Sequence, residues 1–174
     1  GPGMPIALMD MNNDDFPELL IVSANKIYSN SSGKFSKPEK LFKHFPDNLI
    51  TTSIFGDFNG DGFLDIFCSG RDMFPLLYEG DASMTFKNKP KVIKSFLEPL
   101  TMPIASTSGD IDGDNDLDIW LTQYKSPYIY GQMPTPYYDA NDGFPSYLLI
   151  NDGNGNFKDM TIMYGLDKKR FRRT

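Results

Sequence analysis

The stretch that decides the fold is Asp110-Ile111-Asp112-Gly113-Asp114-Asn115-Asp116-Leu117-Asp118, which runs directly into the apolar segment Ile119-Trp120-Leu121. Aspartate stands at every second position of this stretch. A strand with this alternation would carry all of the carboxylates on one face, where like charges repel. A hard cation with oxygen ligands would neutralise them, so the stretch is a candidate metal-binding loop.

The same pattern occurs twice more. It recurs as Asp57-Phe58-Asn59-Gly60-Asp61-Gly62-Phe63-Leu64-Asp65 and, in a weaker form with Pro17 and Glu18, as Asp10-Met11-Asn12-Asn13-Asp14-Asp15-Phe16-Pro17-Glu18. We call these copies loop one (10–18), loop two (57–65) and loop three (110–118). Their starts are 47 residues apart (10 to 57) and then 53 apart (57 to 110). Each has an extended segment before it, and an apolar strand and a Gly- or Asn-bearing hairpin after it.

A four-stranded unit repeated at roughly 40–50 residues is the sequence sign of a β-propeller blade. We therefore predict an all-β chain of three four-stranded antiparallel blades, forming one β-propeller segment over residues 1–174. The fourth strand of each blade is expected to open with a phenylalanine, namely Phe35, Phe86 and Phe157. Blade one spans about 4–48, blade two about 49–100 and blade three about 101–167, with 168–174 as a basic tail or linker.

Blade three also carries a Tyr- and Pro-rich insertion at about 124–146. Such a loop either carries function or covers a sheet edge. Three blades do not close a propeller ring, because closed propellers have about four blades or more. The remaining blades are expected to come from the same longer chain or from another copy.

Calcium takes about six to eight oxygen ligands, which a short loop supplies when alternate residues turn inward. Positions 1, 3 and 5 of each loop offer side-chain oxygens, position 7 a backbone carbonyl, and position 9 a carboxylate. The predicted ligands are Asp10, Asn12, Asp14, Phe16, Glu18, Asp57, Asn59, Asp61, Phe63, Asp65, Asp110, Asp112, Asp114, Asp116 and Asp118. Positions 4 and 6 hold residue types that tolerate positive φ, as a tight curl requires: Asn13, Asp15, Gly60, Gly62, Gly113 and Asn115. We expect up to three Ca²⁺ ions.

Other sites fit less well. An EF-hand needs a glutamate at position 12, where this chain has Ile21, Cys68 and Leu121. Zinc is disfavoured because the chain has one cysteine and one histidine, neither in a loop. Cys68 lies in an apolar run and is expected to be a buried small hydrophobe.

The net charge of −6 is concentrated in the loops, and there is no basic stripe apart from Lys168–Arg173, so no nucleic-acid partner is predicted. Neither a membrane-spanning apolar run nor a signal peptide is evident, and no membrane insertion is expected. The first residues, Gly1 to Met4, could be a cloning remnant.

Two segments carry a family resemblance. Ile54–Ile66 and Ser108–Ile119 resemble the FG-GAP/VCBS repeat, whose best-known members are the integrin α-subunit heads. Leu148–Thr161, running on to Leu166, and the insert Tyr137–Gly143 are similar to secreted, cartilage-acidic-protein-like members. The resemblance implies a propeller of about seven blades. It also implies calcium between the first two strands of each blade, an extracellular setting and protein or glycan partners. Met9 departs from the glycine that Gly56 and Gly109 match before the loop, which makes blade one the least typical.

We expect a calcium-binding recognition or adhesion module that is extracellular, cell-surface or periplasmic and binds a protein or glycan ligand through its loops. Two alternatives remain open: the propeller part of a glycan-cleaving enzyme, and an assembly repeat whose blades pair between chains. Candidate groups for an enzyme are Asp139, Asp142, Glu79, Tyr137 and Tyr138. Nothing sets them apart from solvated residues, and we assign no catalytic residue.

Overall fold

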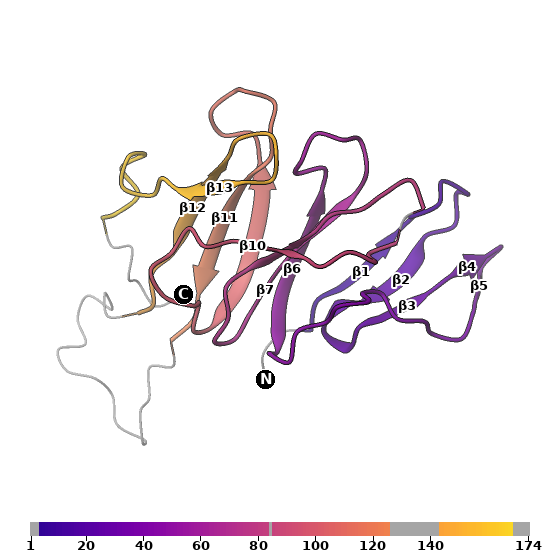
Figure 1. The fold of residues 1–174 in the computed structure, drawn as a ribbon. Helices are drawn as coiled ribbons and strands as arrows, with labels where there is room; N and C mark the ends of the chain where they lie inside the picture. The colour runs from indigo at the N-terminus through magenta and orange to yellow at the C-terminus, as the bar shows by residue number, and fades with distance from the viewer. Residues whose placement is uncertain (1–3, 84, 126–142, 169–174) are drawn as a thin grey trace, which may run out of the picture.

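The computed structural model describes residues 4–83, 85–125 and 143–168. Within these residues the chain is all-β, apart from one short 3₁₀ turn, η1 (Val22–Ala24). Every strand pairing between the named strands is antiparallel. Figure 1 shows the three main sheets side by side in chain order, with blade two in the middle. This confirms the predicted fold class, an all-β chain of propeller blades.

Blades two and three each form one four-stranded sheet in simple chain order, with the acidic loop joining the first two strands. Each first strand pairs with its second strand up to the edge of the loop, at Gly56↔Asp65 in blade two and Gly109↔Asp118 in blade three. The strands are β6 (Ile50–Gly56), β7 (Asp65–Gly70), β8 (Leu76–Tyr78), β9 (Lys91–Val92), β10 (Pro103–Gly109), β11 (Asp118–Gln123), β12 (Tyr147–Asn151) and β13 (Phe157–Asp159).

Blade one is less regular than the prediction. Its main sheet has three strands, β1 (Ile6–Met9), β2 (Glu18–Ile21) and β3 (Lys26–Tyr28), beside a separate hairpin of β4 (Asn30–Ser31) and β5 (Lys34–Phe35). The place of a fourth strand beside β3 is taken by Glu39, which exchanges two backbone hydrogen bonds with Ile27 at 3.0 and 2.9 Å. Pro38 lies between Phe35 and Glu39 and has no N–H to donate, so the fourth strand is split.

In blade two the predicted start of the fourth strand is wrong. Its fourth strand does not open at Phe86 but is β9, at Lys91–Val92. Phe86 is buried and stacks edge-on against Phe42, at 5.5 Å between ring centroids. The aromatic side chain belongs to the core, and the strand begins only after it. The expected insertion in blade three and the basic tail lie largely outside the described residues, which omit 126–142 and 169–174.

Neighbouring blades pack through opposite faces of each sheet, so successive residues of β7 belong to different cores. Ile66 and Cys68 pack in the core shared with blade one, together with Leu20. Phe67, between them, packs in the core shared with blade three, together with Leu121. Cys68 is fully buried in the core shared with blade one, as predicted, and burial raises the pKa of its thiol.

The first strands of blades two and three also meet through polar contacts. The hydroxyl groups of Thr52 and Ser106 lie 2.8 Å apart, and the Thr51 hydroxyl donates to the Pro103 carbonyl. These hydroxyls keep their hydrogen bonds in a buried interface, which avoids the cost of an unpaired polar group. The interface therefore fixes β6 against β10 as well as burying side chains.

The outward face of blade one is apolar and open. Ile6 and Leu8 are 60% and 62% exposed, and they pair across the ladder with Ile21 and Leu19. Cross-strand partners point to the same side of a sheet, so these four side chains share one face. The alternate residue Leu20 packs against blade two. In blades two and three the positions that match Leu19 and Ile21 are buried against the preceding blade.

Candidate metal centre

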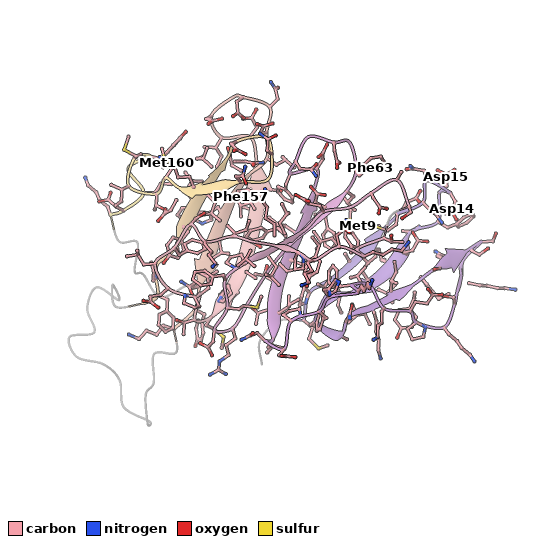
Figure 2. The ribbon with its side chains drawn as sticks, in the orientation of Figure 1. Met9, Asp14, Asp15, Phe63, Phe157 and Met160 are labelled. Atoms are coloured by element: carbon pink, nitrogen blue, oxygen red, sulfur yellow. The ribbon has the colours of Figure 1, made fainter. Side chains whose placement is uncertain are left out.

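The three acidic loops lie along one edge of the stack of sheets. In Figure 1 the connections β1–β2, β6–β7 and β10–β11 project from the same side of the molecule. Figure 2 shows Asp14 and Asp15 of loop one and Phe63 of loop two along this edge. The repeat in the sequence is therefore a repeat in space, with one loop for each blade.

The backbone of each loop curls as predicted. Positions 4 and 6 have positive φ in all three copies: Asn13 (54°), Asp15 (68°), Gly60 (73°), Gly62 (84°), Gly113 (85°) and Asn115 (72°). Only Gly, and to a lesser degree Asn and Asp, adopt this conformation at low cost. The curl brings the N–H groups of the turn to the carboxylate at position 1.

The carboxylate at position 1 organises the loop. In loop two, Asp57 Oδ1 accepts hydrogen bonds from the N–H groups of Gly60 and Asp61 at 2.8 and 3.2 Å. Its Oδ2 accepts one from Gly62 at 2.8 Å. The matching acids Asp10 and Asp110 accept from their own loops in the same way. The carboxylate at position 1 is thus held in place by the backbone N–H groups of its own loop.

Loop three differs from the others at position 3. In loops one and two an asparagine amide there donates to the carboxylate at position 5, from Asn12 to Asp14 and from Asn59 to Asp61, each at 3.0 Å. Loop three has Asp112 in this place, so its side chain meets Asp114 without an amide donor. Loss of hydration, followed by repulsion from the nearby acids, raises the pKa of Asp112. Loop three therefore holds the greatest unbalanced negative charge.

Three carboxylates of loop three converge. Asp110, Asp112 and Asp118 each place an oxygen within 4.8 Å of the others. Two oxygens bound to the same Ca²⁺ at its usual distances lie at most about 5 Å apart. Carboxylate oxygens are also the ligands that hard cations prefer. The donor set of loop three fits a calcium ion in both spacing and chemistry.

The carboxylate at position 9 does more than face the loop. Asp118 is fully buried, and its Oδ2 accepts a hydrogen bond from the Ile111 N–H at 2.9 Å. Its Oδ1 accepts one from the N–H of Asn151, at the end of β12, also at 2.9 Å. One side chain therefore joins the loop to the third strand. The matching contacts are Glu18 with Met11 and Asn30, and Asp65 with Phe58 and Gly80.

The residue at the end of the third strand is a partner that the sequence analysis missed. Asn151 also donates from Nδ2 to the Leu117 carbonyl at 3.2 Å, and to the Phe58 carbonyl of blade two at 2.8 Å. Asn30 makes the equivalent bond to Pro17 at 2.9 Å. The signal was the recurrence of Asn, Gly and Asn at or two residues past the end of the third strand: Asn30 and Gly80 lie two residues past β3 and β8, and Asn151 ends β12.

In blade two this position is Gly80, and only glycine fits there. A Cβ on Gly80 would lie 2.2 Å from the Leu64 carbonyl oxygen, the group that the asparagine amide binds in the other blades. The chain at or just past the end of the third strand thus approaches the carbonyl at position 8 in every copy, through an amide or through direct backbone contact.

The remaining predicted residues are placed as follows. At position 7 the side chains of Phe16 and Phe63 are each 38% exposed, so they take no part in the interior of the loop. Their carbonyls as ligands, with that of Asp116, stay a prediction. Among the groups considered for an enzyme, Glu79 is exposed beyond the end of β8. Asp139, Asp142, Tyr137 and Tyr138 lie outside the described residues.

Antiparallel blades in series, each with an acidic loop in its first hairpin, define a β-propeller repeat protein. The model of the FG-GAP-like repeat matches residues 10–68 and 57–121, which together span more than half of the chain. The chain belongs to the FG-GAP-like repeat family.

Among solved structures, the chain is similar to the V. cholerae biofilm matrix protein Bap1 in its crystal structure, with a TM-score of 0.44 and 22% sequence identity. The similarity covers 89% of this chain and 19% of that one, so the chain spans about a fifth of the length of Bap1. No curated protein matches the chain. Within the described residues, no helix has the length and apolar character needed to cross a membrane.

The acid at position 9 binds backbone N–H groups, and the acid at position 3 adds negative charge. Substitution can separate these two roles. We expect Asp118→Asn to lower the free energy of unfolding of the calcium-free protein by about 2 kcal/mol, because an amide N–H₂ would oppose a backbone N–H in a buried site. Asp112→Asn should leave that free energy unchanged or raise it slightly, since it removes repulsion and gives the amide found in loops one and two. Urea unfolding in a chelator measures both. An equal loss of unfolding free energy in the two variants would contradict the assignment of these two roles.

Calcium binding to loop two should depend on pH. Burial raises the pKa of Asp65 to about 6, because lost hydration outweighs the N–H groups of Gly80 and Phe58. The folded, calcium-free protein therefore holds a proton there below about pH 6 that calcium must displace, and this proton favours folding as the pH falls from about 6 towards 4. We expect the affinity of loop two to fall by up to about ten-fold per pH unit below that pKa.

Calorimetric calcium titrations at pH 7 and pH 5 measure this effect. The protein for this experiment carries Asp14→Asn and Asp112→Asn, which weaken loops one and three and leave loop two as the main site. An affinity that is the same at both pH values would show that Asp65 is already ionised in the calcium-free protein, contrary to the effect of its burial.

Proposed function

We propose that the chain is a calcium-stabilised recognition or adhesion module of an extracellular protein, with one ion in each acidic loop. The observation that carries this proposal is the convergence of the Asp110, Asp112 and Asp118 carboxylates within 4.8 Å of one another. Like charges at this separation are costly unless a cation lies between them. In each loop the ion would be held by the side chains at positions 1, 3, 5 and 9 and by the carbonyl at position 7.

The metal would be structural. The loop joins the first two strands of a blade, and position 9 also holds the third strand. A cation bound to positions 1 and 9 would therefore connect all three strands through one centre. No histidine or lysine stands within these loops to act as an acid or base. The bound ion would supply positive charge and rigidity rather than chemistry.

We infer an extracellular, cell-surface or periplasmic setting from the family. Extracellular calcium modules bind with dissociation constants of the order of 10⁻⁴–10⁻³ M, which suits compartments where free calcium is high, and we expect an affinity in this range. The partner would be a protein or a glycan bound by loops. The enzyme and the assembly between chains stay alternative predictions.

Thermal unfolding with and without calcium tests the proposal. With a dissociation constant of about 0.5 mM, 5 mM calcium would stabilise each site by about 1.4 kcal/mol. Three sites would then raise the melting temperature by roughly 10 °C over that in EDTA. A double variant, Asp110→Asn with Asp112→Asn, should lose about a third of this rise. Asp47→Asn, at an exposed acid outside the loops, should lose none.

The same melting curves in magnesium give the control for ion type, because Mg²⁺ demands a tighter octahedral site and keeps its waters. A melting temperature that does not change between EDTA and calcium would refute the proposal.

A further inference from the structure

One hydrogen-bonded path joins the acidic loops of blades two and three. In loop two the Phe58 N–H donates to Asp65 Oδ2 at 2.9 Å, and the Phe58 carbonyl accepts from Asn151 Nδ2 at 2.8 Å. The Asn151 N–H donates to Asp118 Oδ1 of loop three, also at 2.9 Å. Asp65 and Asp118 are the acids at position 9 of their loops, so one asparagine links two predicted calcium ligands.

The whole path is buried. Phe58, Asn151 and both position 9 acids are shielded from water. The Asn151 side chain is held at both of its polar atoms, because Oδ1 accepts from the Asp152 N–H at 3.0 Å and Nδ2 also donates to the Leu117 carbonyl at 3.2 Å. A buried polar group that loses its partner is costly, so neither loop can change shape without disturbing a bond to the other.

Backbone contacts strengthen this link. The turn between β12 and β13 reaches from blade three towards the β6–β7 connection of blade two (Figure 1). A Cβ on Gly60 of loop two would lie 3.3 Å from the Gly153 carbonyl oxygen in this turn. A Cβ on Gly153 itself would overlap the Asp116 carboxylate of loop three. The turn therefore lies against both loops.

Loops one and two are not joined in this way in the described part of the chain. The residue of blade two that matches Asn151 is Gly80, which donates its N–H to the position 9 acid of its own loop but has no side-chain amide to reach loop one. A hollow of about 240 Å³ lies between these two loops instead. It is lined by Asp10 and Met11 on one side and by Phe63 on the other.

An ion in one loop would favour the bond to the other loop. Without an ion the carboxylates of a loop repel one another, and the loop opens more readily. The Asn151 bridge needs both loops closed, because it binds the Phe58 carbonyl of one loop and Asp118 of the other. Closing one loop with calcium would therefore increase the share of molecules in which the bridge is formed, and the second loop would close at a lower cost.

We propose that Asn151 couples the calcium sites of loops two and three, so that an ion in either loop raises the affinity of the other, while loop one binds its ion independently. Asn151 is a positioning residue, which acts on the two sites through the Phe58 peptide and Asp118. The inference rests on the proposed function, because it needs an ion in each of the two loops. It adds a dependence between sites that the family match and the geometry of the separate loops do not assign.

The test is a calcium titration of the whole 174-residue protein, in which the NMR signal of the Gly60 amide reports on loop two. Asp112→Asn with Asp114→Asn weakens loop three and keeps Asp110 and Asp118, which set its shape. We expect this double variant to raise the dissociation constant of loop two about five-fold, within the usual range of coupling between sites.

Loop one gives the first control. Asp14→Asn weakens loop one, and it should change the dissociation constant of loop two by less than about two-fold, because the hollow separates these loops. The effect between loops two and three should also be reciprocal. Asp61→Asn, which weakens loop two, should raise the dissociation constant of loop three by a similar factor, read from the Gly113 amide.

The matched pair of variants is Asn151→Gly and Asn30→Gly. Asn151→Gly introduces the residue that blade two has here, keeps the backbone N–H and removes the bond to Phe58. In this background, weakening loop three should change loop two by less than about two-fold. Asn30→Gly removes the matching amide of blade one, which binds Pro17 of its own loop, and the five-fold effect should remain. A purely structural Asn151 would shift loop two equally with loop three intact or weakened.

An affinity of loop two that is indifferent to loop three overturns the coupling, and this comparison needs no change at Asn151. A five-fold effect that persists in Asn151→Gly overturns it as well. Both results leave the calcium proposal standing, because the loops still fill with calcium and the melting temperature still rises. Failure of calcium to bind shows instead as an unchanged melting temperature, which refutes the proposed function and the coupling with it.

Discussion

The structure depends on one buried carboxylate in each blade. Asp118 accepts one backbone N–H from its own loop and one from the end of the third strand. Buried charge is tolerated only when it is well hydrogen-bonded, and here the backbone supplies both donors. The first three strands of a blade therefore converge on a single side chain. The Asn151 amide extends the convergence to the preceding blade through the Phe58 carbonyl, so the acidic loops and the contact between blades share one polar centre.

Different positions of a loop set its shape and its net charge. Positions 1 and 9 bind backbone N–H groups and set the shape, as Asp57 and Asp65 show in loop two. The residue at position 3 decides how much charge is left over, since asparagine supplies an amide where Asp112 supplies another carboxylate. The loops can thus be alike in shape and differ in how much negative charge a cation would neutralise. Loop three, with its converging carboxylates, has the most.

The sequence predicted the blade, its strands around the loops and the positive φ at positions such as Gly60 and Asn115, because these follow from local residue types at fixed spacing. It could not place the fourth strand of blade two, since Phe86 suits a strand as well as a core and only the tertiary contact with Phe42 decides. The loop contacts of Asn151 were missed for a related reason. They join segments far apart in sequence, and the recurrence of Asn30, Gly80 and Asn151 does not by itself show which backbone groups these residues meet.

The packing of blade two through both faces has a consequence for how this repeat tolerates changes in length. Because Ile66 and Phe67 belong to different cores, a slip of one residue in β7 would present each to the wrong neighbour. Insertions are therefore excluded from the loop and the second strand, which keep the same spacing in every copy. Beyond them the spacing is free: the residue that meets position 9 follows the loop start by 20 residues (10 to 30), 23 (57 to 80) and 41 (110 to 151). Changes in length between the copies therefore fall between the second strand and the residue that meets position 9.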